Sequence, residues 1–513
     1  MTVAHVYTVA FQGIDAREVD VQVHIGEGGN GQVNIVGLAD KAVAESRERV
    51  RSALSSIGLA LPYQRITVNL APADLPKEGS HYDLPIALGL LAAMGVIPAS
   101  EMANYVALGE LSLDAAITPV AGVLPAALAA SEQNRGLICP AANGPEGAFA
   151  GGIEILAAPS LIALVNHMKG ASVLVPPVPR LVEAARSAPD LRDVKGQESA
   201  KRAIEIAAAG GHNLLFMGPP GAGKTMLARR LPSILPPLSL DEALEVTAIH
   251  SVVGMLSADR GILSARPFRA PHHTVSAAGL VGGGDPVRPG EVSLAHHGCL
   301  FLDELCEFKS HVLEALRQPL EDGHVTICRA RARALFPARP LLVGAINPCP
   351  CGHLLDRSRR CLCSAERVRA YRQKLSGPLL DRIDMHVVLP PVDVAHLQSS
   401  SPGEESSVVR ARVIEARRAQ RTRGGQLGVA SVNAELRPRE LERVARPDDR
   451  GAALLATAVE RLGLSARAYD KVLRVARTIA DLDGSEAVHA AHVAEAIQAR
   501  LLDRDPTFQA RVA

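Results

Sequence analysis

The chain has 513 residues, which is too long for a single hydrophobic core and predicts about three domains of ~150 residues each. Its 55 lysine and arginine residues nearly cancel its 54 aspartate and glutamate residues, which excludes a globally basic nucleic-acid-binding protein and leaves only a local basic patch for that role. Hydrophobic residues make up 47% of the chain and charged residues 21%, as is typical of a soluble globular protein.

The chain shows no pattern of an export signal or a membrane span. Its first residues lack a basic stretch followed by an apolar one. The longest apolar run, Leu84–Ala99, contains Pro85 and Pro98 and is shorter than the ~20 residues that cross a bilayer. We therefore expect a cytoplasmic protein without a membrane partner.

Residues 1–170 alternate strand-like and helix-like segments, which predicts an α+β domain without a phosphate loop of its own. The apolar patterns predict strands at Val21–Ile25, Gln32–Val36 and Ile66–Leu70, and helices at Asp40–Ile57 and Leu84–Met94. Residues 171–189 begin with the proline-rich stretch Ala171–Pro179, which favours extended backbone, so we predict a linker there.

The stretch LLFMGPPGAGKTMLARR, Leu214–Arg230, matches the G-x-x-x-x-G-K-[ST] phosphate-loop pattern between a strand-like and a helix-like segment. In such a loop, backbone N–H groups surround a triphosphate, the lysine reaches the β and γ phosphates, and the hydroxyl ligates Mg²⁺. The following helix directs its positive N-terminal end at the same anion. We therefore predict that ATP and Mg²⁺ bind at Gly218, Pro219, Pro220, Gly221, Ala222, Gly223, Lys224 and Thr225, with Thr225 on the metal.

Two further strand-like runs end in polar residues. GCLFLDEL, Gly298–Leu305, places Asp303 where a carboxylate can hold Mg²⁺ and Glu304 where a general base can polarise the attacking water. A buried strand with a charged end is the alternative. PLLVGAINP, Pro340–Pro348, ends in Asn347, which we expect at the carboxyl edge of the sheet, beside the water or the γ-phosphate. A lone asparagine is otherwise more often a turn former.

Four of the eight cysteines form one cluster, Cys349 and Cys351 followed after nine residues by Cys361 and Cys363. In a reducing compartment, two close pairs of thiolates can close a tetrahedral Zn²⁺ site around a short loop. C-x-C pairs are less standard than C-x-x-C pairs, and four free thiols are the alternative. Zinc here would be structural and would stiffen a loop near the active site.

The segment Glu321–Pro340 has the pattern of a hairpin and is rich in arginine. Arg329, Arg331 and Arg333 fall at i, i+2 and i+4, so an extended backbone would place them on one face. Arginines suit contact with a nucleic-acid backbone, because phosphate contacts do not depend on sequence. A solvated basic strand edge that prevents aggregation is the alternative.

Residues 392–513 are helical by pattern. The arginine-rich stretch Val408–Thr422 is followed by amphipathic segments at Ala452–Leu462, Asp470–Leu482 and Ala487–Leu502. We interpret most of these arginines as a solvated helix face, with DNA contact as the alternative.

Several stretches, in this order, resemble an AAA+ ATPase: DVKGQ (Asp193–Gln197), the phosphate loop, FLDE, Asn347 and SGPLLDRID (Ser376–Asp384). RPFRAPHHTVS (Arg266–Ser276), GGGDPVRPGEVSLAHHG (Gly282–Gly298) and AINPCPCG (Ala345–Gly352) are similar to the magnesium-chelatase-like branch. With the N-terminal region, nearly the whole chain resembles the ComM/YifB family. The resemblance implies an α/β fold in which residues 190–391 form the AAA+ P-loop ATPase core and residues 392–513 a C-terminal helical lid.

The same resemblance implies roles for residues that the pattern alone leaves open. Arg382 would be an arginine finger supplied to the neighbouring subunit's ATP, which is worth roughly 10³ to 10⁵ in rate. On sequence alone, a surface ion pair of Arg382 is the simpler interpretation. Arg467, in Ser465–Leu482, would be the second sensor. A finger at an interface implies a homo-hexameric ring, and the hairpin arginines would contact DNA in its pore.

The first region is similar to the Lon-type protease fold through LPKEGSHYDLPIALGLL, Leu75–Leu91. His81 stands in the place of the nucleophilic serine, with Ser80 just before it, and Leu124 stands in the place of the activating lysine. A hydroxyl without a base is a poor nucleophile. We therefore expect a Lon-protease-like α+β domain that is not proteolytic and that serves assembly or substrate gating.

The resemblance implies an ATP-hydrolysing hexameric DNA motor, a helicase or branch-migration enzyme of homologous recombination or natural transformation that acts on single-stranded or branched DNA. Two alternatives stay open. A metal-chelatase-type ATPase subunit would share the ATPase core but would lack the N-terminal region. A protein-remodelling AAA+ ATPase would thread polypeptide, which aromatic pore residues favour more than arginines do.

Overall fold

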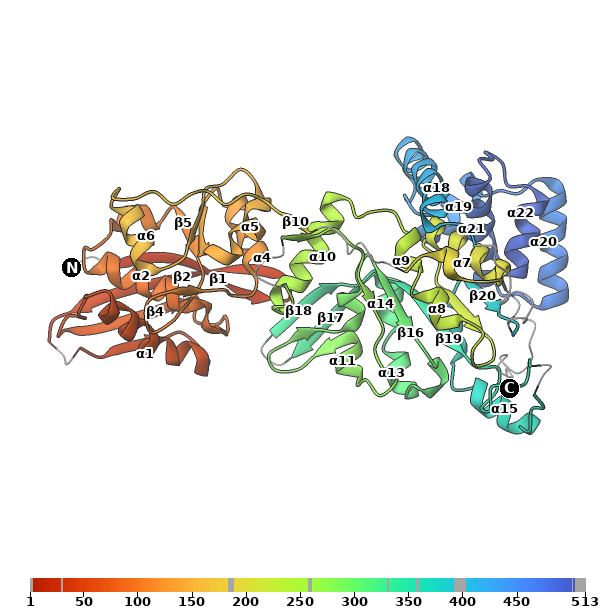
Figure 1. The fold of residues 1–513 in the computed structure, drawn as a ribbon, viewed down its shortest axis with the longest axis horizontal. Coiled ribbons are helices and arrows are strands. Elements are labelled where there is room, and N and C mark those ends of the chain that lie inside the picture. The colour runs from red at the N-terminus through yellow and green to blue at the C-terminus, as the bar shows by residue number, and fades with distance from the viewer. Residues whose placement is uncertain are drawn as a thin grey trace.

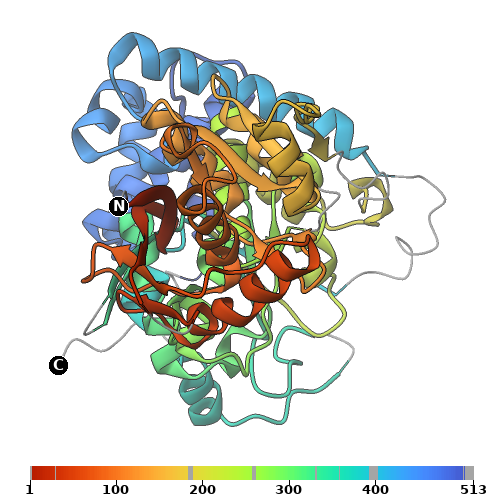
Figure 2. The ribbon, with the colours of Figure 1, turned by 90° about the vertical axis from the view of Figure 1, so that its left-hand side faces the viewer.

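The computed structural model describes residues 3–28, 31–182, 189–256, 261–329, 332–356, 359–391, 403–500 and 502. Three regions follow one another along the longest axis of the molecule (Figure 1). The N-terminal region lies at one end, a parallel sheet with its helices lies in the middle, and a helical region lies at the other end. Seen from the N-terminal end, the N-terminal region lies in front of the other two (Figure 2).

A seven-stranded mixed sheet, in the order β3-β4-β2-β1-β5-β8-β9, organises the N-terminal region. Its strands are β1 (Ala4–Gln12), β2 (Asp15–Gly26), β3 (Val33–Val36), β4 (Arg65–Ala71), β5 (Tyr105–Ala107), β8 (Gly136–Pro140) and β9 (Ile155–Ala158). Its main helices are α1 (Lys41–Ser56), α2 (Asp83–Ala93), α4 (Val123–Glu132) and α6 (Leu161–Met168). These elements confirm the three strands and two helices that the apolar patterns predict.

Alternation along β1 explains why this sheet is covered on both faces. Val6 packs in a buried cluster with residues of α1 and α2, whereas Val9 packs in a second cluster with residues of α4. Successive side chains of a strand point to opposite faces, so one strand contributes to two cores.

A five-stranded parallel sheet, in the order β13-β16-β19-β11-β20, forms the central region. The strands are β13 (Phe268–Arg269), β16 (Cys299–Leu302), β19 (Leu341–Ile346), β11 (Leu214–Met217) and β20 (Met385–Val388). Leu214 and Phe216 face a cluster that includes helix α7 (Glu198–Gly210), and Leu215 faces the opposite cluster with Leu305 and Leu316. Because both faces are buried, the strands are apolar throughout and their polar residues lie at their ends.

The C-terminal helices are α18 (Ser406–Leu427), α19 (Pro438–Val444), α20 (Asp449–Leu462), α21 (Ala466–Leu482) and α22 (Ala490–Gln498). The cluster around Phe216 continues into Val413 of α18 and Val472 of α21. The helical region therefore shares one core with the central sheet and has a fixed position on it. Ser465 caps α21 by accepting a hydrogen bond from the Ala468 N–H.

The N-terminal region contacts the central region at two places. The Gly122 N–H donates to the Ser251 carbonyl, 3.1 Å away, at the end of α10 (Leu240–Val252). Gly13 forms a parallel bridge with Leu335 of β18 (Ala332–Pro337). The predicted linker, residues 171–189, contains β10 (Leu181–Val182), which pairs with β12 (Ile262–Leu263), so its described part includes a short strand. Every helix among the described residues is too short or too polar to cross a membrane.

Candidate nucleotide-binding site

The phosphate loop connects β11 to helix α8 (Lys224–Ala228) at the carboxyl edge of the central sheet. Gly223 precedes α8 with a φ of 91°, a left-handed conformation that favours glycine. A Cβ at Gly218 would lie 2.7 Å from the Leu389 carbonyl oxygen, so a larger residue there would displace the backbone. The conformation of the phosphate loop thus requires glycine at positions 218 and 223, two of the residues by which the sequence pattern is recognised.

Lys224 is 9% exposed, and its ammonium lies inside the loop. It donates to the carbonyl oxygens of Gly218 at 2.6 Å and Pro219 at 3.0 Å, and to Oδ1 of Asn347 at 3.0 Å. Burial lowers the pKa of Lys224, and the nearby carboxylates of Asp303 and Glu304 oppose that shift. A buried cation held only by neutral oxygens is a suitable partner for phosphate oxygens.

Thr225 and Asp303 form the second contact of the site. The Thr225 hydroxyl donates to Oδ2 of Asp303 over 2.7 Å, although the residues belong to different elements. Asp303 directly follows β16, and its Oδ1 accepts from the Glu304 N–H at 2.9 Å. A hydroxyl and a carboxylate oxygen side by side fit the oxygen ligands and small size of Mg²⁺.

Glu304 extends from the edge of the same site. Its backbone has a φ of 50°, which turns the chain sharply after β16, and its side chain is 53% exposed. The Nδ1 atom of His273 lies 3.6 Å from its carboxylate. Glu304 is therefore accessible to solvent beside the Thr225–Asp303 pair. The sequence marks His273 only as one of two adjacent histidine pairs, for which a structural or pore-loop role is the simpler interpretation; its place beside Glu304 was not predicted.

Gln197 is a further residue of the site that sequence reasoning did not select. Its side-chain amide donates to the Ala222 carbonyl at 3.2 Å and to the Pro390 carbonyl at 2.8 Å. It thereby fastens the phosphate loop to the chain that follows β20. The only sequence signal was its place in the DVKGQ stretch.

Arg382 and Arg467 lie at the opposite, amino edge of the sheet. The Arg382 carbonyl accepts from the side chain of Asn213, the residue before β11, at 3.1 Å. Its guanidinium donates to the carbonyls of Arg317 and Pro378 at 3.0 and 2.8 Å and pairs with the carboxylate of Glu321. Arg467 is 72% exposed, 3.9 Å from Asp381, and both arginines line one cavity of about 1140 Å³. Both arginines thus lie at the edge opposite to the one that carries the phosphate loop.

The predicted arginine face of the hairpin is wrong. Strand β17 (His324–Arg329) pairs antiparallel with β18, and Arg329 lies opposite Ala332. The chain therefore reverses between these residues, so Arg329 and Arg333 belong to different strands and share no continuous face. Arg333 is exposed, and Arg331 lies outside the described residues. Arg329 and Arg333 instead lie near the ends of two paired strands, where Arg333 is opposite Cys328.

The four predicted cysteines come together. One sulfur from each lies within 4.8 Å of the others, so the cluster could hold a metal ion. A second group, Glu245 with His296 and His297, has a different explanation: Nδ1 of His296 accepts from the Arg339 N–H at 3.0 Å, so its Nε2 carries the proton that it donates to Glu245. That hydrogen-bond arrangement accounts for the group without a metal.

In the N-terminal region, the residues near the proposed protease motif bond elsewhere. Ser80 donates to the carboxylate of Glu110, and Lys77 donates to the Pro72 carbonyl. His81 is buried, which lowers its pKa, and Nε2 of its ring lies 2.9 Å from the Val9 carbonyl. Among the described residues, no hydrogen bond joins Ser80 to a lysine. The serine is therefore not activated in the way a serine–lysine dyad requires.

A parallel sheet with a phosphate loop, a Thr–Asp pair and a polar strand end at one edge defines a P-loop ATPase. Three family models match the chain. "Magnesium chelatase, subunit ChlI" matches residues 190–397, "Subunit ChlI of Mg-chelatase" matches residues 21–143, and "Magnesium chelatase, subunit ChlI C-terminal" matches residues 403–500.

Similar proteins extend the match to nearly the full length. Competence protein ComM of Haemophilus influenzae is 44% identical over 510 residues, covering 98% of each chain, and Uncharacterized protein YifB of Escherichia coli is 43% identical over 506 residues with the same coverage. The chain belongs to the ComM/YifB family, with a magnesium-chelatase-like AAA+ ATPase domain at its centre.

The magnesium-chelatase 38 kDa subunit of Rhodobacter capsulatus is 28% identical over 173 residues, which are 30% of this chain and 49% of that protein. The family model matching residues 21–143 is itself described as a chelatase subunit, so the N-terminal region does not by itself exclude that class, contrary to the expectation from the sequence. The length of the match separates the two groups of relatives more clearly, because ComM and YifB match 98% of this chain and the chelatase subunit matches 30% of it.

Proposed function

We propose that this chain assembles into a hexameric ring, hydrolyses ATP at the contacts between subunits and uses the energy to move DNA strands. The observation that carries the proposal is the separation of the site into two halves. Lys224, Thr225 and Asp303 lie at one edge of the central sheet, and Arg382 lies at the other. A complete site then requires the carboxyl edge of one subunit and the amino edge of the next, which a closed ring supplies to every copy.

In this proposal each residue has a role in phosphoryl transfer. Mg²⁺ would neutralise charge on the transferring group, and Thr225 and Asp303 are the residues that would hold it. Lys224 binds the β and γ phosphates in place of its present carbonyl partners. Glu304 takes a proton from the attacking water, and Asn347 orients that water. Arg382 and Arg467 of the neighbouring subunit stabilise the charge that develops on the phosphate.

The DNA part of the proposal has two supports. The similar protein of Haemophilus influenzae is a competence protein, and competence concerns the uptake of DNA. The arginine-rich hairpin tip between Arg329 and Arg333 offers the positive charge that binds a phosphate backbone. The substrate would be single-stranded or branched DNA, during recombination or transformation in the cytoplasm. The N-terminal region would be a non-proteolytic, Lon-protease-like assembly module, and the C-terminal helices would act as a lid.

The test measures ATP hydrolysis and strand displacement on a forked DNA duplex. We expect DNA to stimulate hydrolysis, and Lys224→Ala to lower hydrolysis by about 10² to 10³ and to remove strand displacement. Changing Arg329, Arg331 and Arg333 together to alanine should abolish displacement, flatten the salt dependence of DNA binding and keep DNA-free hydrolysis. The matched control changes Arg410, Arg418 and Arg421, three exposed arginines of α18, and should leave displacement intact.

A second class remains testable in the same assay because the matching family models are described as magnesium-chelatase subunits. If the wild-type chain hydrolyses ATP but neither binds DNA nor responds to it over a range of salt concentrations, the DNA motor is wrong. The ATPase would then serve a chelatase-type or protein-remodelling partner.

A further inference from the structure

The cysteine loop, residues 349–363, lies between β19 and helix α15 (Ala365–Arg372). Among its described residues none is in a helix or strand. Its sulfur atoms are close together: Cys349 lies 3.4 Å from Cys351 and 3.7 Å from Cys361, and Cys351 lies 3.6 Å from Cys361. The four thiols therefore lie together within the described part of the loop.

These sulfur–sulfur distances fit a tetrahedral metal site and do not fit a disulfide. A disulfide would require about 2.05 Å between sulfurs, so the thiols are not paired. Four sulfurs at about 2.3 Å from a tetrahedral Zn²⁺ would be about 3.8 Å from one another. The three separations of 3.4–3.7 Å are close to that value. In addition, the Cys363 N–H donates to the sulfur of Cys361 at 3.4 Å, which fixes the position of that sulfur.

Neighbouring groups hold the cluster in place. Cys349 is fully buried. The buried guanidinium of Arg372 donates twice to the Pro348 carbonyl, at 3.1 and 3.0 Å. The guanidinium is therefore bonded to the residue that directly precedes Cys349. Zn²⁺ with four thiolates carries a net charge of two minus, and the guanidinium offsets part of it.

The loop also contacts the phosphate loop. A Cβ added at Gly352, which has a φ of 81°, would lie 2.5 Å from Cδ of Pro220. Gly352 therefore packs directly on the ring of Pro220, the third residue of the phosphate loop. On the other side, Asn347 lies two residues before Cys349 and bonds to Lys224 at 3.0 Å. The cysteine loop thus borders the nucleotide site at two points.

We propose that Cys349, Cys351, Cys361 and Cys363 bind one Zn²⁺ ion and that the metal-loaded loop braces the phosphate loop, so that metal loading sets the affinity for ATP. Binding converts four thiols to thiolates and releases their protons to solvent. The inference rests on the proposed ATPase function, because it concerns the nucleotide site of that enzyme. Soft thiolate ligands in a tetrahedral set select zinc over Mg²⁺.

The test begins with the full chain purified under reducing conditions and uses zinc itself, with Co²⁺ as a spectroscopic probe. We expect one zinc per chain and a tetrahedral thiolate absorption after exchange with Co²⁺. Removal of zinc by a chelator should weaken binding of a fluorescent ATP analogue about 10-fold, as loss of outer-shell support does at metal sites, and added zinc should restore it. Cys351→Ser should reproduce the loss, whereas Cys328→Ser, an exposed cysteine outside the cluster, should not.

The Gly352→Val variant tests whether the contact between the cysteine loop and the phosphate loop matters while the metal ligands are kept. It keeps all four thiols and should keep the Co²⁺ absorption, yet its side chain would collide with Pro220 and weaken ATP binding. If the purified chain contains no zinc and shows no Co²⁺ thiolate absorption, the proposed metal site is wrong. If the chain binds zinc but its affinity for ATP stays unchanged when a chelator removes the metal, the proposal that the loop braces the phosphate loop is wrong. Zinc-dependent ATP binding without hydrolysis would support this inference while refuting the proposed ATPase.

Discussion

The two edges of the central sheet carry polar groups of different kinds. At the carboxyl edge the proposed site residues bond to one another, Lys224 to Asn347 at 3.0 Å and Thr225 to Asp303 at 2.7 Å. At the amino edge Arg382 bonds to carbonyl groups and to a single exposed carboxylate of its own chain. The first set is preorganised by its own contacts, whereas the second presents a guanidinium that bonds to carbonyl groups and an exposed carboxylate. The difference teaches that the residues of the proposed site divide between two edges of one chain, as an active site shared between neighbouring subunits would require.

A buried ion pair and a hydrogen bond hold the residues at the amino edge of the sheet in place. Asp384 accepts from the Asn213 N–H at 2.9 Å and pairs with Lys471 of α21 at 3.1 Å. Since Arg467 lies on the same helix and Arg382 two residues before Asp384, this ion pair fixes the two arginines relative to each other. The helical region therefore positions the two arginines that the proposed function assigns to a neighbouring subunit's site.

Arg382→Ala gives the largest effect expected. If Arg382 completes the site of a neighbour, kcat for ATP hydrolysis should fall by about 10³ to 10⁵. Affinity for ATP should stay unchanged, because the phosphate loop of the same chain is intact. Arg418→Ala, an exposed arginine on α18, is the control and should have no effect. A kcat close to that of the wild type would remove Arg382 from the mechanism.

Lys224→Ala should lower kcat by about 10² to 10³ and also weaken ATP binding, because it removes the buried cation of the loop. Mixing this variant with Arg382→Ala sharpens the comparison. Some mixed contacts contain an intact loop from one chain and an intact arginine from the next, so activity should return. A mixture that assembles into rings but stays inactive would show that the two edges do not cooperate between chains.

The carboxyl edge could be predicted from the sequence because its residues follow short apolar strands. Parallel strands end at one edge, so the phosphate loop, Asp303 and Asn347 had to come together. The structure places them in contact, as expected. Gln197 was missed because its partners, Ala222 and Pro390, are distant in sequence and offer only backbone carbonyls.

The other errors have similar physical causes. The hairpin was predicted, but no glycine or asparagine after Arg329 marks where it reverses, so the three arginines were assigned to one extended stretch. The amino edge could not be predicted from local patterns, since Asn213 and Asp384 are 171 residues apart. Arg382 was reached only through the family resemblance.

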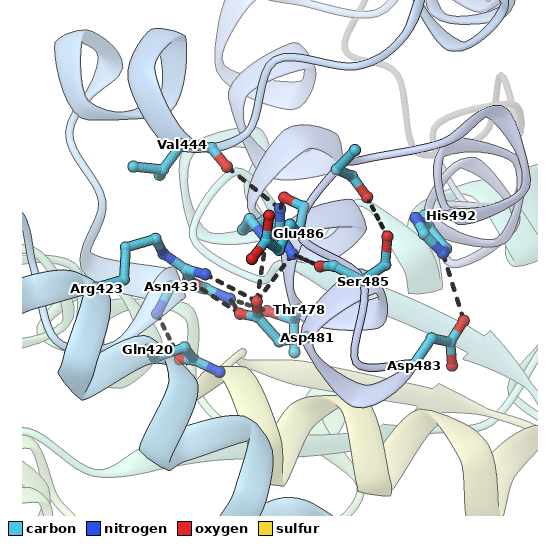
Figure 3. A network of polar contacts seen from close by, with 12 residues as sticks. Gln420, Arg423, Asn433, Val444, Thr478, Asp481, Asp483, Ser485, Glu486 and His492 are labelled. Carbon is cyan, nitrogen blue, oxygen red and sulfur yellow. Dashed lines mark hydrogen bonds and ion pairs between the residues drawn. The ribbon is translucent and has the colours of Figure 1, made fainter.

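Asp481→Asn tests the helical region at a distance from either edge. Asp481 accepts from Arg423 at 2.8 and 2.9 Å, from Arg477 at 2.9 Å and from Asn433 at 2.8 Å (Figure 3). Removing its charge leaves two arginines without their carboxylate in a buried network, which should cost about 3–5 kcal/mol of unfolding free energy. Calorimetric unfolding checks this.

Asp483→Asn is the matched control for that change. Asp483 is 49% exposed, 3.4 Å from His492 and 3.5 Å from Arg202, so its loss should cost under about 1 kcal/mol. Equal losses in the two variants would mean that the Asp481 network is not a stabilising feature. At temperatures where both variants are folded, ATP hydrolysis should match the wild type.

Acid titration of Asp384 should give the smallest effect. Burial alone would raise the pKa of Asp384, but Lys471, His212 and the Asn213 N–H together outweigh it, so its pKa is lowered. A carboxyl with a lowered folded pKa adds stability above its unfolded pKa of about 3.9, and that stability is lost as pH falls through the folded value. Asp384→Asn has no such group to titrate.

The free energies of unfolding of wild type and Asp384→Asn, obtained from thermal unfolding, should therefore differ by a constant amount from about pH 8 to pH 5. Below about pH 4 the difference should shrink, with a slope of up to about 1.4 kcal/mol per pH unit for one proton. A difference that stays constant down to pH 3 would mean that the ion pair with Lys471 does not hold the amino edge together. In that case the fixed placement of Arg382 beside Arg467 would need another cause, and the shared hydrophobic core beneath α21 would be the remaining one.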